Sequence, residues 1–268
     1  GMPGGSTAAG TTSGSTVTCP PGGYTGSISF SGNGSLVFPG GTYQLDSTVS
    51  FSGNGIVTLG PGFYYFRRGL TVSGNATIAM APGTYVFDGS AFSIGGNARL
   101  VLQGQPTSCS GVGQEFRLFF RNSSFTVQGN FGLQNVLPCD VLVYLNNSDF
   151  ALNGNTDSVL PPGLYYFDGG TFRLQGNQTI TGQDVLFYFG PGSSFDVVGN
   201  TRYVLSGVTD PAKLPYPGMR PGLVIFQARG NTSTLRMVGN SGAQVNGILY
   251  VPDGTLDLRG NVSGTWAR

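Results

Sequence analysis

The dipeptide Gly-Asn recurs along the chain at a nearly constant spacing, and this repeat constrains the fold more than any other feature. Successive members of one series of these copies lie 21 to 23 residues apart in most places, and three intervals are longer, at 33, 25 and 40 residues. The asparagines of this series are Asn33, Asn54, Asn75, Asn97, Asn130, Asn155, Asn177, Asn200, Asn240 and Asn261. A period of this length is typical of repeat architectures, in which each unit stacks on the one before it.

Each repeat unit has the pattern of three short strands. An alternating run precedes the Gly-Asn, as at residues 171–175, and a run of apolar and aromatic residues lies further upstream, as at 165–167. A third run follows, as at 76–80, and a Pro-Gly pair such as Pro82-Gly83 closes the unit. Alternation places every second side chain on one face of a strand. Three strands joined by tight turns form one coil of a parallel β-helix, which buries its inward face only against neighbouring coils.

We therefore expect an all-β, single-domain, right-handed parallel β-helix of about ten coils, with roughly 21–22 residues per coil. Residues 19–268 form this domain, with insertions near 103–115 and 201–221, and the Gly/Ser/Thr-rich residues 1–18 form a flexible linker. A competing interpretation makes Asn33-Gly34 a hairpin turn of an antiparallel sandwich. Hairpins would set a period of roughly 8–12 residues, which leaves the longer repeat unexplained.

We interpret the asparagines as a structural turn ladder rather than a ligand-binding row. Glycine adopts positive φ without steric cost, and asparagine is among the few other residues that tolerate the left-handed region. Stacked at one corner of the coils, their amides can hydrogen-bond up and down the stack.

The chain has three cysteines, Cys19, Cys109 and Cys139. The last two precede runs at 116–120 and 141–145 that are expected in adjacent coils, so Cys109–Cys139 is our disulfide candidate. Such a bond would clip the first insertion to the next coil. Three cysteines do not define connectivity, and Cys19 is either unpaired or takes one of the two partners. A disulfide would imply an exported protein.

The second insertion is rich in proline between residues 209 and 221. A long extension from one coil is a candidate binding loop, and its candidate residues are Lys213, Tyr216 and Arg220. The alternative is that this loop only covers the side of the rod.

The composition gives little support for catalysis. The absence of histidine excludes His-based acid–base chemistry, His metal ligands and Ser-His-Asp triads. Asp46, Asp88 and Asp168 follow the aromatic run at a similar register, but Arg67 holds the equivalent place between the first two. Asp168 is several coils further away, and turn formation explains all three. The sequence predicts no catalytic residue, no metal site and no cofactor.

Aromatic residues, 19 Phe and 12 Tyr, occur mainly at alternating strand positions. Stacking in the core between equivalent residues of successive coils is the first interpretation. The alternative is a sugar-stacking face made from Tyr64, Tyr165 and Tyr188.

A net charge of +1, with 9% charged residues, gives no basic stripe or patch. We therefore expect no nucleic-acid partner and no direct membrane insertion of this fragment. We expect an extracellular or cell-surface location, with any export signal or anchor outside these residues.

One region resembles a known family. The stretches 222–227 (GLVIFQ), 229–232 (RGNT), 238–242 (VGNSG) and 246–252 (NGILYVP) resemble the C-terminal region of bacterial TadE/TadG-like proteins, which are associated with tight-adherence pilus assembly. The match covers about forty residues, 222–261. The resemblance implies an envelope-anchored, surface-exposed protein and carries over no catalytic residues.

These observations favour a non-enzymatic, exported β-solenoid that acts as a cell-surface or pilus-associated structural or adhesion module. Its expected partners are other surface or pilus proteins, or glycans, and end-to-end association of the rods stays open. The alternative is a polysaccharide-binding or polysaccharide-cleaving β-helix.

Overall fold

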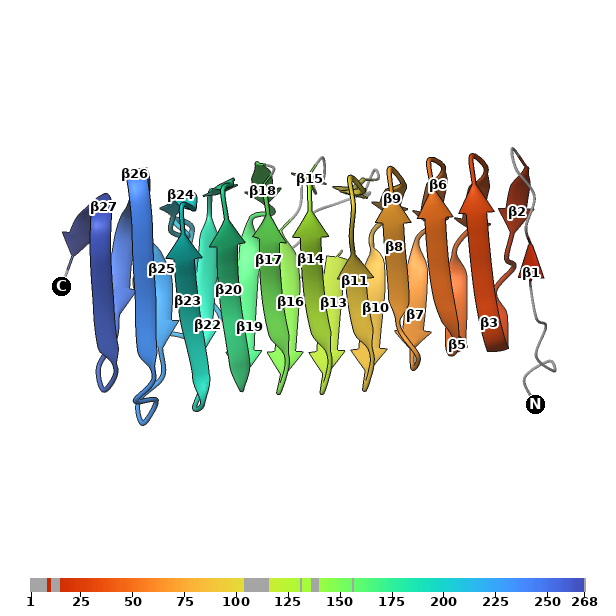
Figure 1. Ribbon diagram of the computed structural model, residues 1–268. Coiled ribbons are helices and arrows are strands. Elements are labelled where there is room, and N and C mark those ends of the chain that lie inside the picture. The colour runs from red at the N-terminus through yellow and green to blue at the C-terminus, as the bar shows by residue number, and fades with distance from the viewer. Residues whose placement is uncertain are drawn as a thin grey trace.

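The structure is a computed structural model, and it describes residues 9–10, 15–103, 116–130, 132–135, 140–155 and 157–267. Within these ranges the chain winds into one elongated β-solenoid, with its coils stacked along a single axis (Figure 1). Named strands pair only in parallel, each with its equivalent in the next coil. The expectation of an all-β parallel β-helix with about ten coils is confirmed.

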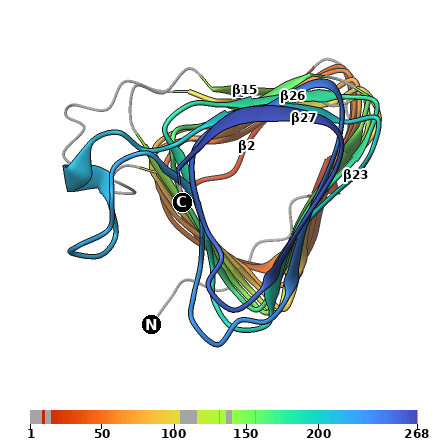
Figure 2. The same cartoon turned by 90° about the vertical axis from the view of Figure 1, so that its left-hand side faces the viewer.

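Viewed along its axis, the solenoid has three faces (Figure 2). The first face contains the aromatic runs and consists of the first parts of β3 (Gly22–Gly32) and β5 (Gly41–Gly53), then β7 (Gly62–Phe66), β10 (Gly83–Asp88), β13 (Phe116–Arg121), β16 (Val141–Asn146), β19 (Gly163–Asp168), β22 (Val185–Phe189), β25 (Leu223–Gln227) and the last residues of β26 (Thr234–Tyr250).

The second face precedes the Gly-Asn corner. It consists of β1 (Ala9–Gly10), the second parts of β3 and β5, then β8 (Leu70–Gly74), β11 (Ala91–Ile94), β14 (Ser124–Gly129), β17 (Asp149–Gly154), β20 (Gly170–Gly176), β23 (Ser193–Gly199) and the first parts of β26 (Thr234–Tyr250) and β27 (Thr255–Ala267).

The third face follows the Gly-Asn corner. It consists of β2 (Thr16–Thr18), β4 (Ser35–Phe38), β6 (Ile56–Leu59), β9 (Thr77–Met80), β12 (Arg99–Leu102), β15 (Gly132–Asn135), β18 (Ser158–Leu160), β21 (Thr179–Gly182), β24 (Arg202–Ser206), the middle part of β26 and the part of β27 that pairs with it.

The winding is right-handed. In Figure 2 the C-terminal coils face the viewer, and the chain passes from β23 on the right to the third face at the top as it advances toward the viewer. This is a counterclockwise path toward the viewer, in the sense favoured for crossovers between parallel strands.

Alternation along each strand fills the interior with stacked rings. Tyr64 lies between Tyr43 and Tyr85, with ring centroids 4.7 Å and 4.9 Å apart, and all three side chains are fully buried. The hydroxyl of Tyr64 donates to the carbonyl oxygen of Gly60 at 2.7 Å, so its polar end is satisfied inside the core. Stacked rings in offset contact add to the hydrophobic burial.

The Gly-Asn corner carries a ladder of side-chain amides. The Nδ2 of Asn54 donates to Oδ1 of Asn33 at 2.9 Å, and the Nδ2 of Asn75 donates to Oδ1 of Asn54 at 2.7 Å. Asn97 and Asn130 continue the series at 2.9 Å and 3.0 Å. These side chains are exposed, so the ladder runs along an outer edge of the rod.

Glycine at this corner is required by close approach of backbones. A Cβ added at Gly55 would lie 1.7 Å from the carbonyl oxygen of Gly34 in the preceding coil. At Gly74 the backbone also has a positive φ of 81°, which side chains rarely adopt. The repeat thus keeps glycine where one coil rests directly on another.

Some element boundaries differ from those expected. Two short strands, β1 and β2, lie inside the segment interpreted as linker, because both pair with the first full coil. The second insertion begins later than residue 201, since β24 completes its coil to Ser206, and the loop comprises residues 207–222. Cys109 and Cys139, with most of the first insertion, lie outside the described residues. Cys19 is buried as a free thiol.

Candidate binding site

A row of aromatic side chains points outward from the first face. Successive residues of a strand face opposite sides, so in β19 the ring of Tyr165 is buried inside while that of Tyr166 lies outside. Equivalent residues of the next coils extend this row. Its members, which we name the outer aromatic row, are Phe119, Tyr144, Tyr166, Tyr188, Phe226 and Tyr250, all half-buried.

The rings of the outer aromatic row contact one another along the rod axis. The centroid distances are 6.2 Å for Phe119–Tyr144, 5.2 Å for Tyr144–Tyr166, 4.4 Å for Tyr166–Tyr188, 5.3 Å for Tyr188–Phe226 and 4.8 Å for Phe226–Tyr250. From Tyr144 onward the planes of neighbouring rings lie within 22° of parallel. Rings inside the row are therefore covered on both faces by their neighbours, and there the ring edges and hydroxyl groups are left to contact a ligand.

The proline-rich loop 207–222 folds over the C-terminal part of this row. Its base is closed by two backbone hydrogen bonds, from Val208 N to Leu223 O at 3.1 Å and from Gly222 N to Val208 O at 2.6 Å. Leu214 and Met219 of the loop pack into an outer hydrophobic cluster on the first face. In Figure 2 the loop projects from one side of the triangular cross-section. The loop thus builds a second apolar layer outside the solenoid wall.

One ion pair clamps the loop to a distant coil. The ammonium group of Lys213 lies 2.8 Å from Oδ2 and 3.1 Å from Oδ1 of Asp140, a largely buried carboxylate just before β16. The pKa of Lys213 is raised above its usual value by this hydrogen bond. Because the loop emerges between β24 and β25, the clamp spans three coils of the first face. Lys213 therefore has a structural partner, and its role differs from that of Tyr216 and Arg220.

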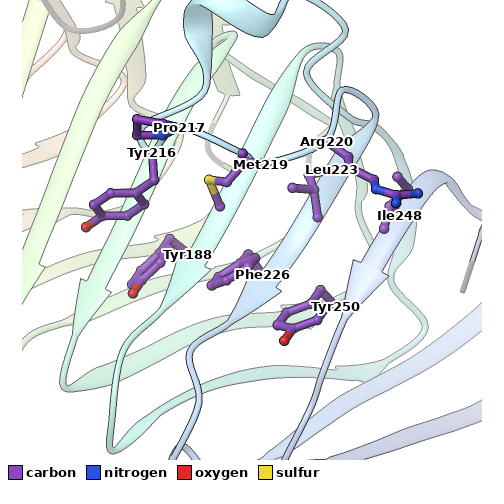
Figure 3. A pocket seen from close by; sticks show the side chains of 10 residues that line it. Tyr188, Tyr216, Pro217, Met219, Arg220, Leu223, Phe226, Ile248 and Tyr250 are labelled. Atoms are coloured by element: carbon purple, nitrogen blue, oxygen red, sulfur yellow. The ribbon is translucent and has the colours of Figure 1, made fainter.

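Between the loop and the row lies an open groove of about 540 Å³. Ring edges of Tyr188, Phe226 and Tyr250 form its floor, and Figure 3 shows them side by side beneath the loop. Tyr216 lies over Tyr188, with ring centroids 5.7 Å apart, and Arg220 lies toward the other end of the groove. Leu223, Ile248, Met219 and Pro217 complete a predominantly apolar lining. Pockets of this kind, apolar with a few polar groups, are typical ligand sites.

Tyrosine hydroxyls gather at one end of the groove. Burial raises the pKa of Tyr166, and hydrogen bonding with the hydroxyl of Tyr216 raises it further. Burial also raises the pKa of Tyr188, with a smaller contribution from the charge of Tyr216. With these raised pKa values, the hydroxyls of Tyr166 and Tyr188 stay protonated at neutral pH and act as hydrogen-bond donors and acceptors. Arg220 at the other end is exposed and has no ion-pair partner within the described ranges.

The three aspartates considered for catalysis do not meet in one place. Asp88 pairs with Arg121 across the coils, and Asp46 lies 3.6 Å from the guanidinium of Arg67. Asp168 accepts hydrogen bonds from two neighbouring side chains at 3.0 Å and 3.1 Å. Their positions form part of a column of charged and polar groups along the corner after the first face. Among the described residues no group of three or more His, Cys, Asp or Glu side chains could hold a metal ion.

The sugar-stacking face suggested by the sequence is wrong as a set. Tyr64 and Tyr165 are buried inside the solenoid, and only Tyr188 lies on the outside. The choice of which ring in a Tyr-Tyr pair faces inward depends on strand register. Pairs of consecutive aromatic residues in these strands indicate the outer row, because two adjacent rings of a strand face opposite sides and one of them must lie outside the core.

Fold and site together define a parallel β-solenoid with an outer aromatic row, part of which is covered by a clamped loop. Comparison with protein-family models, curated proteins and solved structures finds no match to this chain. Within the described residues, no helix is long and apolar enough to cross a membrane.

Proposed function

We propose that the chain is a non-enzymatic, exported β-solenoid that acts as a cell-surface or pilus-associated structural and adhesion module. The observation that carries this proposal is the outer aromatic row beneath a clamped loop, on a rod whose carboxylates are dispersed. A rigid solenoid presents an extended surface at a fixed distance from its ends. The proposed role of this protein is therefore to bind a partner rather than to catalyse a reaction.

The flank of the second face supports a structural role. Arg173 lies 3.4 Å from Asp196, Arg236 lies 3.6 Å from Asp196, and Arg236 lies 4.0 Å from Asp257. Arginine and aspartate thus alternate along the rod axis, and each forms ion pairs with its neighbours in adjacent coils. Each such exposed pair contributes little alone, about 0–1 kcal/mol, so the ladder serves register and solubility more than stability.

The resemblance of residues 222–261 to TadE/TadG-like proteins adds the pilus-associated part of the proposal. It is tested in the organism that produces the protein, by labelling intact cells with an antibody against the rod and by counting pili in a deletion strain. We expect surface labelling, together with reduced piliation or attachment after deletion. Labelling only after cell lysis, with normal piliation and attachment, would overturn the proposal.

A reducing-end release assay on a panel of polysaccharides tests the non-enzymatic part independently. The dispersed aspartates predict no turnover. Sustained release of reducing ends by purified protein, lost in Asp88→Asn or Asp168→Asn, would replace this proposal with a polysaccharide-cleaving enzyme.

A further inference from the structure

We propose that the groove beneath loop 207–222 binds a proline-rich segment of a partner protein in the polyproline II conformation, with an acidic residue beside the prolines. This inference deepens the proposed adhesion role and rests on it, because it names the partner chemistry of the same surface.

The form of the floor favours prolines over sugars. Sugar rings stack on exposed aromatic faces, but the faces of Tyr188, Phe226 and Tyr250 cover one another at 5.3 Å and 4.8 Å. What the row offers instead is a line of ring edges along the rod axis, with the apolar side chains of Leu223 and Ile248 beside it in the groove. Aromatic-lined grooves of this kind accept the apolar rings of proline-rich segments. A sugar would also require more polar partners than this lining supplies.

The spacing of the coils distinguishes between extended peptides. Neighbouring strands lie about 4.8 Å apart, so two coils span about 9.6 Å. A polyproline II helix advances about 9.3 Å per three-residue turn, and it therefore presents an equivalent residue to every second ring of the row. A peptide in a β-strand presents equivalent side chains every 6.8 Å or so, which matches neither one coil nor two.

The hydrogen-bonding groups also fit this occupant. A polyproline II segment has no internal hydrogen bonds, and its carbonyl groups need donors from water or from a partner. Tyrosine hydroxyls at the groove supply them, because those of Tyr188 and Tyr216 lie at one end and that of Tyr250 lies along the floor (Figure 3). Proline lacks an N–H group, so the shortage of acceptors in the lining costs this ligand little.

Charge sets the orientation and flanking residue of the partner. Arg220 lines the groove, is exposed, and has no ion-pair partner in the part of the chain that the structure describes. Its guanidinium can donate two parallel hydrogen bonds to the carboxylate of an aspartate or glutamate next to the prolines.

The loop itself contributes a proline to the lining of the groove. Within the Pro-Tyr-Pro sequence at 215–217, Pro217 lines the groove and the ring of Tyr216 packs on Tyr188. A partner segment would extend this existing contact over Phe226 and Tyr250, where the groove is open.

Fluorescence anisotropy with the purified chain tests the proposal. The probe is a labelled synthetic peptide with two Pro-Pro-Leu turns followed by glutamate, and the reference is a Gly/Ser peptide of equal length and charge. We expect saturable binding of the proline peptide only. Tyr216→Ala, on the loop rather than in the solenoid wall, should weaken binding about tenfold or more, because an exposed ring that becomes covered by the peptide is lost. Phe63→Ala, which removes an exposed ring of the first face far from the groove, should leave it unchanged.

A charge exchange tests the arginine contact. Arg220→Glu should weaken binding of the glutamate peptide about two- to fivefold, the usual range for an exposed ion pair, and a lysine-bearing peptide should restore it. Absence of saturable binding, equal binding of the Gly/Ser peptide, or preferential binding of an acidic oligosaccharide would each overturn the inference. Normal surface labelling with no peptide binding would reject this partner class alone, whereas failure of surface labelling would reject the proposed function.

Discussion

At the scale of single residues, the same dipeptide performs different structural tasks at different corners. From Asn33 to Asn130 the asparagine amides of the repeat series are exposed and bond to the preceding coil, as Asn75 does with Asn54. In Gly230-Asn231 the asparagine is buried, and its Nδ2 donates to the carbonyl oxygens of Gly190 and Ser193 at 2.7 Å and 2.9 Å. Sequence alone identifies the dipeptide but does not determine the corner to which it belongs.

Contact between coils predicts which glycines cannot be replaced. Gly55→Ala would place Cβ 1.7 Å from the carbonyl oxygen of Gly34, so the backbone must move. We expect a loss of about 1–3 kcal/mol in the free energy of unfolding, measured by chemical denaturation. Gly95→Ala is the matched control, because its Cβ would meet nothing within 4 Å. It should be neutral or slightly stabilising, and equal losses in the two variants would contradict the close contact between coils.

The pairing of Asp88 with Arg121 predicts a pH dependence of stability. Hydrogen bonds from Arg121, and then from Tyr65, lower the pKa of Asp88 to about 2. An unfolded aspartate has a pKa of about 3.9, so the ionised group stabilises the fold above about pH 4. This contribution is lost as the pH falls from about 4 toward 2.

Denaturation series at several pH values check this dependence. The free energy of unfolding should fall less steeply between pH 4 and pH 2 in Asp88→Asn than in the unchanged protein. Arg121→Gln should flatten the same interval, since it removes the main cause of the lowered pKa. If the free energy of unfolding changed with pH in the same way in all three proteins, the Asp88–Arg121 pair would not contribute to the pH dependence.

At the scale of a strand, adjacent aromatics are divided between two surfaces. In β7 the ring of Phe63 is 41% exposed, whereas the next ring, Tyr64, is fully buried between Tyr43 and Tyr85. Alternation was predictable from the sequence, but which of two neighbouring rings enters the core was not. That choice depends on the register of the whole strand against its neighbours, because a shift of one residue exchanges the two faces.

This division predicts unequal costs for neighbouring substitutions. Tyr64→Leu removes a ring that contacts four other rings, and it leaves the carbonyl oxygen of Gly60 without its donor, so we expect a loss of about 2–5 kcal/mol. Phe63→Leu should change stability by no more than about 0.5 kcal/mol. Thermal and chemical unfolding of the two variants provide the comparison, and similar losses would contradict the register of the first face.

At the scale of the whole molecule, the sequence predicts the rod well and the site poorly. The fixed Gly-Asn spacing arises from contacts between neighbouring coils, so it is visible along the chain. The groove depends on the position of a loop that reaches back over three coils. Its Lys213 contacts Asp140, which lies 73 residues earlier in the sequence. No local pattern encodes such a contact. Tyr216 and Arg220, predicted as binding residues of the loop, do line the groove.

The single lysine of the chain allows the loop clamp to be tested by proteolysis. A protease that cuts only after lysine has Lys213 as its sole target in this sequence. While Lys213 is paired with Asp140, the folded chain should be cut slowly. Asp140→Asn should raise the cleavage rate several-fold at little cost to the thermal midpoint, with Asp253→Asn as control. Rapid cleavage of the unchanged protein would contradict the clamp.

The central claim is that this rod acts at the cell surface by binding. Quantitative attachment of three otherwise identical strains tests it most directly: one deleted for the protein, one complemented with the unchanged chain, and one complemented with the Tyr216→Ala, Arg220→Ala double variant. We expect that deletion lowers attachment, that the unchanged chain restores it, and that the double variant reaches the surface without restoring it. Equal attachment by all three strains would contradict the claim.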